Sequence, residues 1–313
     1  MKKALKIIFS IVFIVAIYLE LCLIFVPKDI SDFGGEEYYR AQSFKTEEKN
    51  SLDVMAFGHS SVYSGFIPAT MFEEYGITSY ASSVPRQSIK SINKLLKEAC
   101  KQQKLKVAIL DVDCLYNGND SSNFSILLAP FRYHYRWKTL KFRDFYALPK
   151  VQNNDINKGY YFSNHIQQFN LTNYMGKETM KEEKISRKNL HQLDKFINIC
   201  NKNNVKVVLM TFPNVLSWNY GRHNFIKNYA AKQNVPFVDL NVIKYNIDFN
   251  NDFRDKGDHL NVYGALKTTS FLGQYLKENY HDLLVDHRGE KRFAKWQKVI
   301  KHFHDLKNGT RTN

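Results

Sequence analysis

The sequence predicts an α/β protein, a doubly wound sheet of about five parallel strands preceded by one membrane-spanning helix. Short apolar segments alternate with amphipathic segments of helical period, which is the first observation. The second is a long apolar run that directly follows a lysine-rich start. Strands separated by single helices pair in parallel, because each crossover returns the chain to the same edge of the sheet.

The N-terminal segment is long and apolar enough to cross a bilayer. Ile7–Val26 carries one charge, Glu20, and about 20 residues at roughly 1.5 Å each span a hydrocarbon layer of roughly 30 Å. Lysines precede this run at positions 2, 3 and 6, so the positive-inside rule predicts a cytoplasmic N-terminus and an extracellular domain. A cleaved signal peptide would have a shorter apolar core and a small-residue cleavage site. We therefore expect an uncleaved, single-pass anchor in the cell membrane.

Five short apolar segments are the predicted strands: Leu52–Phe57, Ile77–Ala81, Leu105–Val112, Val205–Phe212 and Pro236–Leu240. Amphipathic segments between and after them are the predicted helices: Pro68–Tyr75, Ser88–Gln103, Leu190–Asn203, His223–Gln233 and Val262–Asn279. Glycine ends the first of these helices at position 76.

The rest of the chain divides around this α/β domain, which we place at residues 52–285. Residues 1–26 are the cytoplasmic N-terminus and anchor, 27–51 a linker without periodicity, and 286–313 a basic C-terminal helix and tail. An insertion at 117–187 interrupts the alternation of strands and helices. Within it, residues 130–137 interleave arginines with aromatic residues, a pattern that suits sugar-ring stacking or phosphate contact. We favour a helical insertion whose aromatic residues form a small core of their own.

The net charge and the cysteine content exclude some classes of function. The chain has 45 Lys+Arg against 30 Asp+Glu, a net charge of +15. An extracellular domain meets no chromosomal DNA, so we expect no nucleic-acid partner; the charge indicates either attraction to anionic polymers and lipid headgroups or simply a lysine-rich proteome. Four cysteines without a C-x-x-C pair exclude a disulfide scaffold and a zinc ribbon. No metal-binding motif is present, and we expect neither a metal nor a cofactor.

Ligands of doubly wound sheets bind beyond the carboxyl ends of the strands, so the segments that follow strands are the candidate site. Gly58–Gly65 follows the first strand and supplies Ser60. Asp255–Ala265 follows the fifth and supplies His259. A serine hydroxyl needs a base to become a nucleophile, and the base needs a carboxylate to fix its tautomer. Gly58 would let the backbone turn tightly, so that amide groups near Ser60 face a developing oxyanion.

These two segments resemble the SGNH/GDSL hydrolase superfamily, through Gly58-His59-Ser60-Ser61 and through Asp255 with His259-Leu260-Asn261-x-x-Gly264-Ala265. The chain is similar to the membrane-anchored Gram-positive branch related to the teichoic-acid D-alanylation protein, whose members are found beside membrane-bound O-acyltransferases. The resemblance covers residues 52–112 and 188–280. It implies a flavodoxin-like sandwich with Ser60 as the nucleophile and His259 as the base.

The sequence departs from the pattern of the superfamily at four places. His59 stands where the family has Asp or Ser, and Ser61 is a second serine beside Ser60. Lys256 occupies the usual position of the acid, which leaves Asp255 and Asp258; we favour Asp255, because adjacent residues point different ways. The oxyanion glycine of the second block falls near Ser82 or Ser83. Gln87 would donate the hydrogen bond that the family's Asn supplies, since the third block has only Asp111-Val-Asp113.

The sequence therefore predicts an extracellular, membrane-anchored serine esterase or O-acyltransferase. In this hypothesis Ser60 attacks an ester carbonyl, His259 carries the proton, and Asp255 or Asp258 orients His259. The resemblance implies an envelope polysaccharide or teichoic-acid-like polymer as substrate and a membrane-bound O-acyltransferase as partner. The alternative is a catalytically inactive binding partner with the same fold. Hydrolysis and acyl transfer share their first half-reaction, so the residues leave that choice open.

Overall fold

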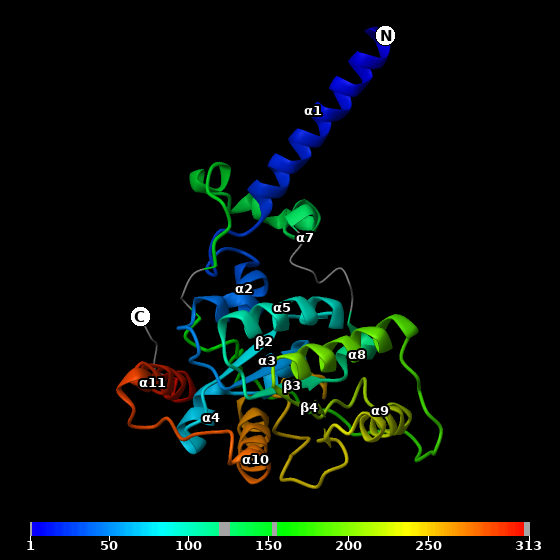
Figure 1. Cartoon of the computed structure of the whole chain (residues 1–313), viewed down its shortest axis with the longest axis vertical. Helices are drawn as coiled ribbons and strands as arrows, with labels where there is room; N and C mark the ends of the chain where they lie inside the picture. The colour runs from blue at the N-terminus through cyan, green and yellow to red at the C-terminus, as the bar shows by residue number, and fades with distance from the viewer. Residues whose placement is uncertain (1, 119–125, 152–154, 310–313) are drawn as a thin grey trace.

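The computed structural model describes residues 2–118, 126–151 and 155–309. At its centre lies a five-stranded parallel sheet in the order β2-β1-β3-β4-β5 (Figure 1). The strands are β1 (Val54–Gly58), β2 (Ser79–Ser83), β3 (Val107–Asp111), β4 (Lys206–Thr211) and β5 (Phe237–Asp239). The predicted fold class is confirmed. β1, which precedes the candidate residue Ser60, is an interior strand.

The sheet separates two cores, because successive side chains of a strand point to opposite faces. In β1, Met55 and Phe57 enter one core, whereas Val54 and Ala56 enter the other. Burial on both faces explains why the strands are continuous apolar runs rather than alternating ones.

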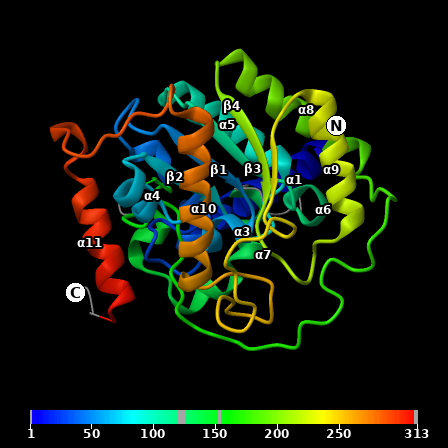
Figure 2. The same cartoon turned by 90° about the horizontal axis from the view of Figure 1, so that it is seen from below.

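Helices cover both faces, as expected for a doubly wound sheet. α5 (Ile89–Gln102) and α8 (Arg187–Lys202) pack side by side on one face. α4 (Pro68–Tyr75) and α10 (Val262–Tyr280) lie together on the other (Figures 1 and 2). α9 (Tyr220–Gln233) flanks β5.

One helix, α1 (Lys2–Phe25), extends away from the domain and leaves its apolar side chains exposed (Figure 1). Within the described part of the chain it is the one helix long and apolar enough to cross a membrane. The residues after it, expected to form a linker, carry α2 (Gly35–Tyr39) and the 3-10 helix η1 (Arg40–Thr46). Phe44 of η1 is fully buried in the core that also contains Met55 and Phe57 of β1. Helices this short leave no periodic pattern, so the sequence did not reveal them.

The first part of the insertion folds into short helices beside the end of α1. These are η3 (Ile126–Leu128), α7 (Ala129–Arg132), η4 (His134–Lys138) and η5 (Phe142–Phe145). Ala129 and Tyr133 form a small core, but its other members, including Val26 and Tyr39, come from the segment after α1. Most aromatic side chains of the insertion are exposed instead. A core shared between distant segments could not be predicted from local pattern.

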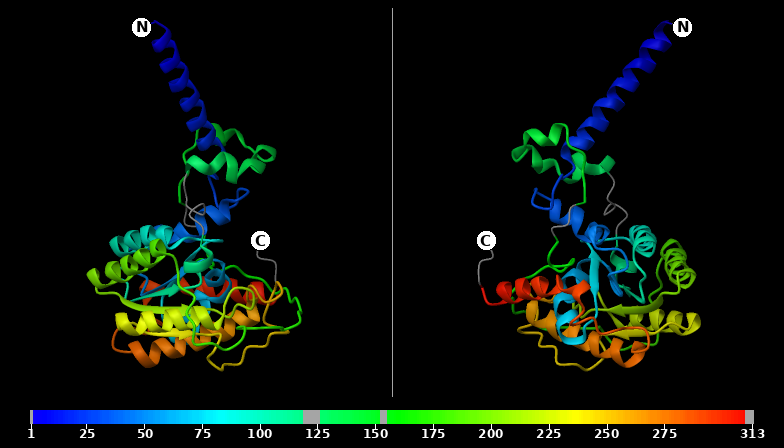
Figure 3. Two further views of the ribbon diagram at one scale, coloured as in Figure 1. Left: turned by 90° about the vertical axis from the view of Figure 1, so that its right-hand side faces the viewer. Right: turned by 60° about the vertical axis from the view of Figure 1, so that its left-hand side comes forward.

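The C-terminal segment forms η6 (Lys291–Phe293) and α11 (Trp296–Lys307). α11 packs on the domain (Figure 3) through an apolar face. The Trp296 ring stacks on Phe72 of α4 with centroids 4.9 Å apart. The lysines of α11, Lys298, Lys301 and Lys307, are exposed.

Candidate active site

Segments that follow all five strands, β1 to β5, border one cavity of about 320 Å³. The described residues that line it are all polar or charged: His59, Ser60, Arg86, Asp113, Asn117, Asn214, Ser217 and Asp258. The cavity lies beyond the carboxyl ends of parallel strands, where sheets of this type bind ligands.

Ser60 is the first residue of α3 (Ser60–Gly65), directly after β1 and the capping residue His59. Ser60 is partly exposed and lines the cavity, whereas its neighbour Ser61 is 4% exposed. Among the described residues, no side chain forms a hydrogen bond with the Ser60 hydroxyl. Of the two serines, Ser60 is thus the one that a substrate can reach.

Asp255 holds His259 by two hydrogen bonds of 2.6 Å. The His259 backbone N–H donates to Asp255 Oδ1, and His259 Nδ1 lies against Asp255 Oδ2. The Asp258 carboxylate is farther from His259 Nδ1, at 3.3 Å, and accepts a hydrogen bond of 3.0 Å from Asn214. Asp255 is therefore better placed to fix the His259 tautomer, which leaves Nε2 to act as a base.

The loop that carries His259 also groups three side chains of types that bind metal ions. Ligand atoms of Asp255, Asp258 and His259 lie within 4.8 Å of one another. The short Asp255–His259 contact is, however, the hydrogen bond that an acid–base pair requires.

The side chain of Asn261 anchors the loop that carries His259. Its oxygen accepts from the N–H groups of Tyr263 and Gly264 and caps α10. Its amide donates to the Asn251 carbonyl at 2.7 Å, across the loop. The Asn in the His-Leu-Asn pattern thus joins the loop of His259 to the start of a buried helix.

His259 and Asp255 line a second cavity of about 440 Å³, which contains Tyr63, Tyr161, Arg40 and Arg254. Both guanidinium groups lie over these tyrosine rings, Arg40 at 4.7 Å from Tyr63 and Arg254 at 4.8 Å from Tyr161. Ser60 and His259 therefore border adjoining cavities, linked through Asp258. The described residues show no hydrogen bond between Ser60 and His259.

Of the four residues expected around the oxyanion, Ser82 and Gln87 make hydrogen bonds within the fold, whereas the Ser83 hydroxyl and the Gln87 amide nitrogen have no partner among the described residues. Ser82 donates to the Ala41 carbonyl, and Gln87 accepts from the Val84 N–H, which fixes the turn after β2. Ser82, Ser83 and Gln87 are fully buried and do not line the cavity. Gly58 does not adopt a positive φ. A Cβ there would lie 2.7 Å from the Asp111 Cβ and 2.5 Å from Val62, so glycine is needed for close packing rather than for a turn.

Sequence reasoning gave His59 no assigned role, and the structure places it inside the site. His59 is 4% exposed, and its Nε2 lies 2.9 Å from Asp113 Oδ2. Its Nδ1 lies 3.7 Å from Asp111 and 3.3 Å from the Ser61 N–H. Burial lowers the pKa of His59, but the ion pairs with Asp113 and Asp111 outweigh it and raise the pKa to about 9. The carboxylates of Asp113 and Asp111 thus favour the protonated form of His59, the residue before Ser60.

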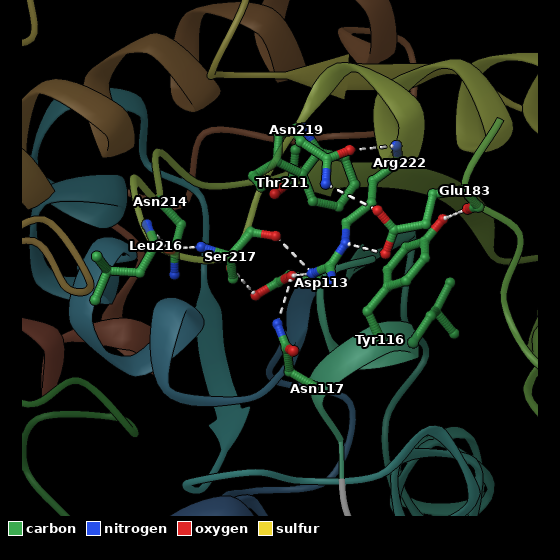
Figure 4. Close-up of polar contacts among 12 residues, drawn as sticks. Asp113, Tyr116, Asn117, Glu183, Thr211, Asn214, Leu216, Ser217, Asn219 and Arg222 are labelled. Atoms are coloured by element: carbon green, nitrogen blue, oxygen red, sulfur yellow. Dashed lines mark hydrogen bonds and ion pairs between the residues drawn. The ribbon is translucent and has the colours of Figure 1, made fainter. Parts of the chain in front are cut away.

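The carboxylate of Asp113 is the centre of a polar network (Figure 4). It accepts hydrogen bonds of 2.9 Å from Ser217 and Asn117, and the Arg222 guanidinium lies 3.5 Å away. Burial raises the pKa of Asp113, yet the hydrogen bond and charge of His59 lower it overall. Burial raises the pKa of Asp111, which has no hydrogen-bonded partner at Oδ2 among the described residues.

Sequence reasoning also missed Asn214 and Ser217, although the signal that could have found them is simple. Both follow β4, so the rule that ligands bind after strand ends applies to them as it does to Ser60. Asn117 belongs to α6 (Cys114–Asn117), after β3.

No protein-family model and no curated protein matches the sequence. The structure is similar to several solved structures at low sequence identity. A GDSL-like lipase from Bacteroides thetaiotaomicron shares 11% identity, with a TM-score of 0.42, over 77% of this chain and 99% of the other. The family 3 carbohydrate esterase of Clostridium thermocellum shares 13%, with a TM-score of 0.41, over 75% and 99%. The lipase/acylhydrolase of Enterococcus faecalis shares 9%, with a TM-score of 0.35, over 72% and 96%. The roles of the site residues rest on the geometry described above.

Proposed function

We propose that the chain is a membrane-anchored serine esterase or O-acyltransferase of the SGNH/GDSL type, with its domain outside the cell and α1 as the uncleaved anchor. One observation carries the proposal. An accessible serine after an interior strand, Ser60, lines one cavity, and a histidine paired with an aspartate, His259 with Asp255, lines a second. Asp258 of the first cavity lies 3.3 Å from His259.

In the proposed reaction, the Ser60 oxygen attacks an ester carbonyl while His259 Nε2 takes the hydroxyl proton. The bond to the leaving alcohol then breaks, and His259 returns the proton to that alcohol. Asp255 stabilises the imidazolium formed on the way. Water or a glycan hydroxyl attacks the acyl-enzyme in the second half, which decides between hydrolysis and transfer. A small closure of the loop that carries His259 would complete the contact with Ser60.

The lining of the cavities supports a polar substrate. The described residues that line the Ser60 cavity are all polar or charged, which suits a short acyl group on a polar carrier rather than a long fatty chain. The adjoining cavity combines Arg40 and Arg254 with the carboxylates of Glu36, Glu37 and Asp255, charged groups that suit a polar carrier. An envelope polysaccharide or teichoic-acid-like polymer fits these surfaces, and a membrane-bound O-acyltransferase is the proposed partner.

The test is labelling of the detergent-solubilised full chain with a fluorophosphonate probe. We expect the wild type to be labelled, Ser60→Ala and His259→Ala to lose labelling, and the matched variant Ser61→Ala to keep it, because Ser61 is buried. A chelator should leave labelling unchanged, since the chemistry assigns no role to a metal. An unlabelled but folded wild type would contradict the proposal.

A second candidate is the inactive binding partner. The observations that favour it are the absent Ser60–His259 hydrogen bond among the described residues and the burial of Ser82 and Ser83 away from the cavity. It predicts a folded protein that binds polymer and never reacts with the probe, so the same experiment separates the two candidates.

A further inference from the structure

Exposed apolar side chains gather around the end of α1 nearest the domain. We call this surface the collar and define it as residues 126–148, which include η3, α7, η4 and η5 (Figure 1). Phe131, Trp137 and Phe142 are 70%, 63% and 85% exposed. Other exposed members are Leu127, Leu128, Tyr135, Phe145, Tyr146 and Leu148. An apolar surface of this extent marks an interaction site.

The collar is attached to α1 at a defined level. The Tyr18 hydroxyl donates to the Leu127 carbonyl at 2.5 Å, and Cys22 contacts the same oxygen at 3.6 Å. Below them, Tyr133 packs in a small core with Val26. The exposed collar residues therefore lie beside the last turns of α1 and not farther out on the domain (Figure 3).

Buried charges make the collar a fixed part of the fold. Arg136 is 1% exposed, pairs with Asp144 at 2.7 Å and lies 3.4 Å from Asp32, just after α1. Arg143 and Lys141 reach the same Asp32 at 2.7 and 3.1 Å. The ion pairs of Arg136, Lys141 and Arg143 thus fix the backbone of the collar in the arrangement that leaves its aromatic side chains exposed.

Basic groups lie among the exposed rings. The Lys138 ammonium is 5.4 Å from the Tyr135 ring centre and 5.5 Å from that of Trp137. Arg132, Lys141 and Arg143 add positive charge. Aromatic rings mixed with lysine and arginine are typical of the layer where a protein meets lipid headgroups.

We infer that the collar lies in the outer headgroup layer of the membrane that α1 crosses, an inference that rests on α1 being the proposed anchor. The span expected from sequence, Ile7–Val26, would bury the collar contacts at Tyr18 and Cys22 in hydrocarbon. The collar instead sets the span at Leu5 to Cys22, about 27 Å at roughly 1.5 Å per residue and close to the hydrocarbon thickness of roughly 30 Å, with the Lys6 ammonium reaching back to the inner headgroups. Tyr18 and Glu20 then lie near the outer boundary, at the level where the collar begins.

This placement has a consequence for the site. The second cavity is lined by His259 on one side and by Gly34, Glu36 and Glu37 on the other, and these three follow α1 closely in the chain. A collar in the headgroups holds that cavity near the membrane surface, where it reaches substrates attached to lipid or presented by a membrane protein.

The test uses fluorescence of the full chain in vesicles of phosphatidylcholine and phosphatidylglycerol, with or without bromine near the headgroup end of the acyl chains. Trp137 is exposed, whereas the other two tryptophans, Trp218 and Trp296, are 3% and 1% exposed. We expect brominated lipid to quench the wild type and Trp137→Phe to lose that quenching. Equal quenching of both proteins, or none in the wild type, would overturn the inference.

Two further variants, made in the Trp137→Phe background, separate the collar from the anchor. Phe13→Trp places a probe within α1, and Met180→Trp places one at a residue that is 93% exposed and outside the collar. We expect quenching of the first by lipid brominated deep in the chains and none of the second. If the Phe13→Trp probe is quenched while Trp137 of the wild type is not, the anchor stands and the collar is refuted. If neither is quenched, the anchor fails, and the collar fails with it.

Discussion

Asp255 and Asp258 both approach His259, and their hydrogen bonds distinguish them. Asp255 makes two contacts of 2.6 Å with His259, whereas Asp258 is engaged by Asn214. We expect Asp255→Asn to lower kcat by roughly 100- to 10,000-fold, because an amide favours the wrong tautomer of the base. Asp258→Asn, the matched control, should cost much less. Ester hydrolysis by both variants at saturating substrate is the measurement, and the reverse order would assign Asp258 as the orienting acid.

His59 couples the stability of the site to pH. Its pKa is raised to about 9 by Asp113 and Asp111, against an ordinary value of 6.5, and Asp258 adds to the same field. A raised pKa means that the stabilisation is complete below about pH 6.5 and is lost as the pH rises towards 9. We therefore expect the free energy of unfolding to fall across this window.

The control for this prediction is His59→Asn, which keeps a polar group but cannot titrate. Its denaturant unfolding curves should show a flatter pH dependence between about 6.5 and 9 than those of the wild type. An unchanged slope would mean that other groups cause the pH dependence.

At the scale of elements, the start of α10 fixes the loop that carries His259. Asn261→Ala removes the helix cap and the hydrogen bond to Asn251, and we expect a loss of about 0.5–2 kcal/mol from the cap alone. Asn261→Asp keeps the cap but cannot donate to Asn251. Thermal melts together with probe labelling separate the two effects: the Asp variant should melt near the wild type yet label more slowly. Equal labelling of the Asp variant and the wild type would show that the Asn251 bond does not position the loop.

At the scale of the whole molecule, Asp32 joins α1 to the collar. Burial raises the pKa of Asp32, but hydrogen bonds from the Lys28 N–H, Lys141 and Arg143 lower it to about 2, so it stays ionised at neutral pH. Asp32→Asn leaves Arg136 buried with one carboxylate fewer. We expect chymotrypsin to cleave the collar of the detergent-solubilised variant several-fold faster than that of the wild type, while labelling of Ser60 is kept.

The control is Lys141→Gln. The Lys141 side chain is 56% exposed, so its ion pair contributes little, and cleavage should stay near the wild-type rate. A change in the rate at which the probe labels Ser60 in Asp32→Asn, relative to the wild type, would instead indicate that the collar and the site are coupled through the segment after α1.

The sequence by itself determined the fold and the outline of the candidate site. Apolar strands buried on both faces and amphipathic helices carry their periodicity locally, so all five strands were located within a few residues, and α4 at its observed bounds. Ser60 and His259 could be proposed because each follows a strand, and strand ends converge at one edge of a parallel sheet.

Only the tertiary structure decided which side chains meet there and how the rest of the chain is used. The pairing of His59 with Asp113 and the contribution of Asn214 and Ser217 depend on distances between loops from different strands. The structure also gave the distances that support Asp255, which the sequence already favoured, over Asp258. The supposed linker and the insertion likewise became ordered through each other, by a small core and the Asp32 ion pairs. The spacing of apolar residues along a segment indicates which of its faces is buried. It does not indicate which other segment of the chain packs against that face.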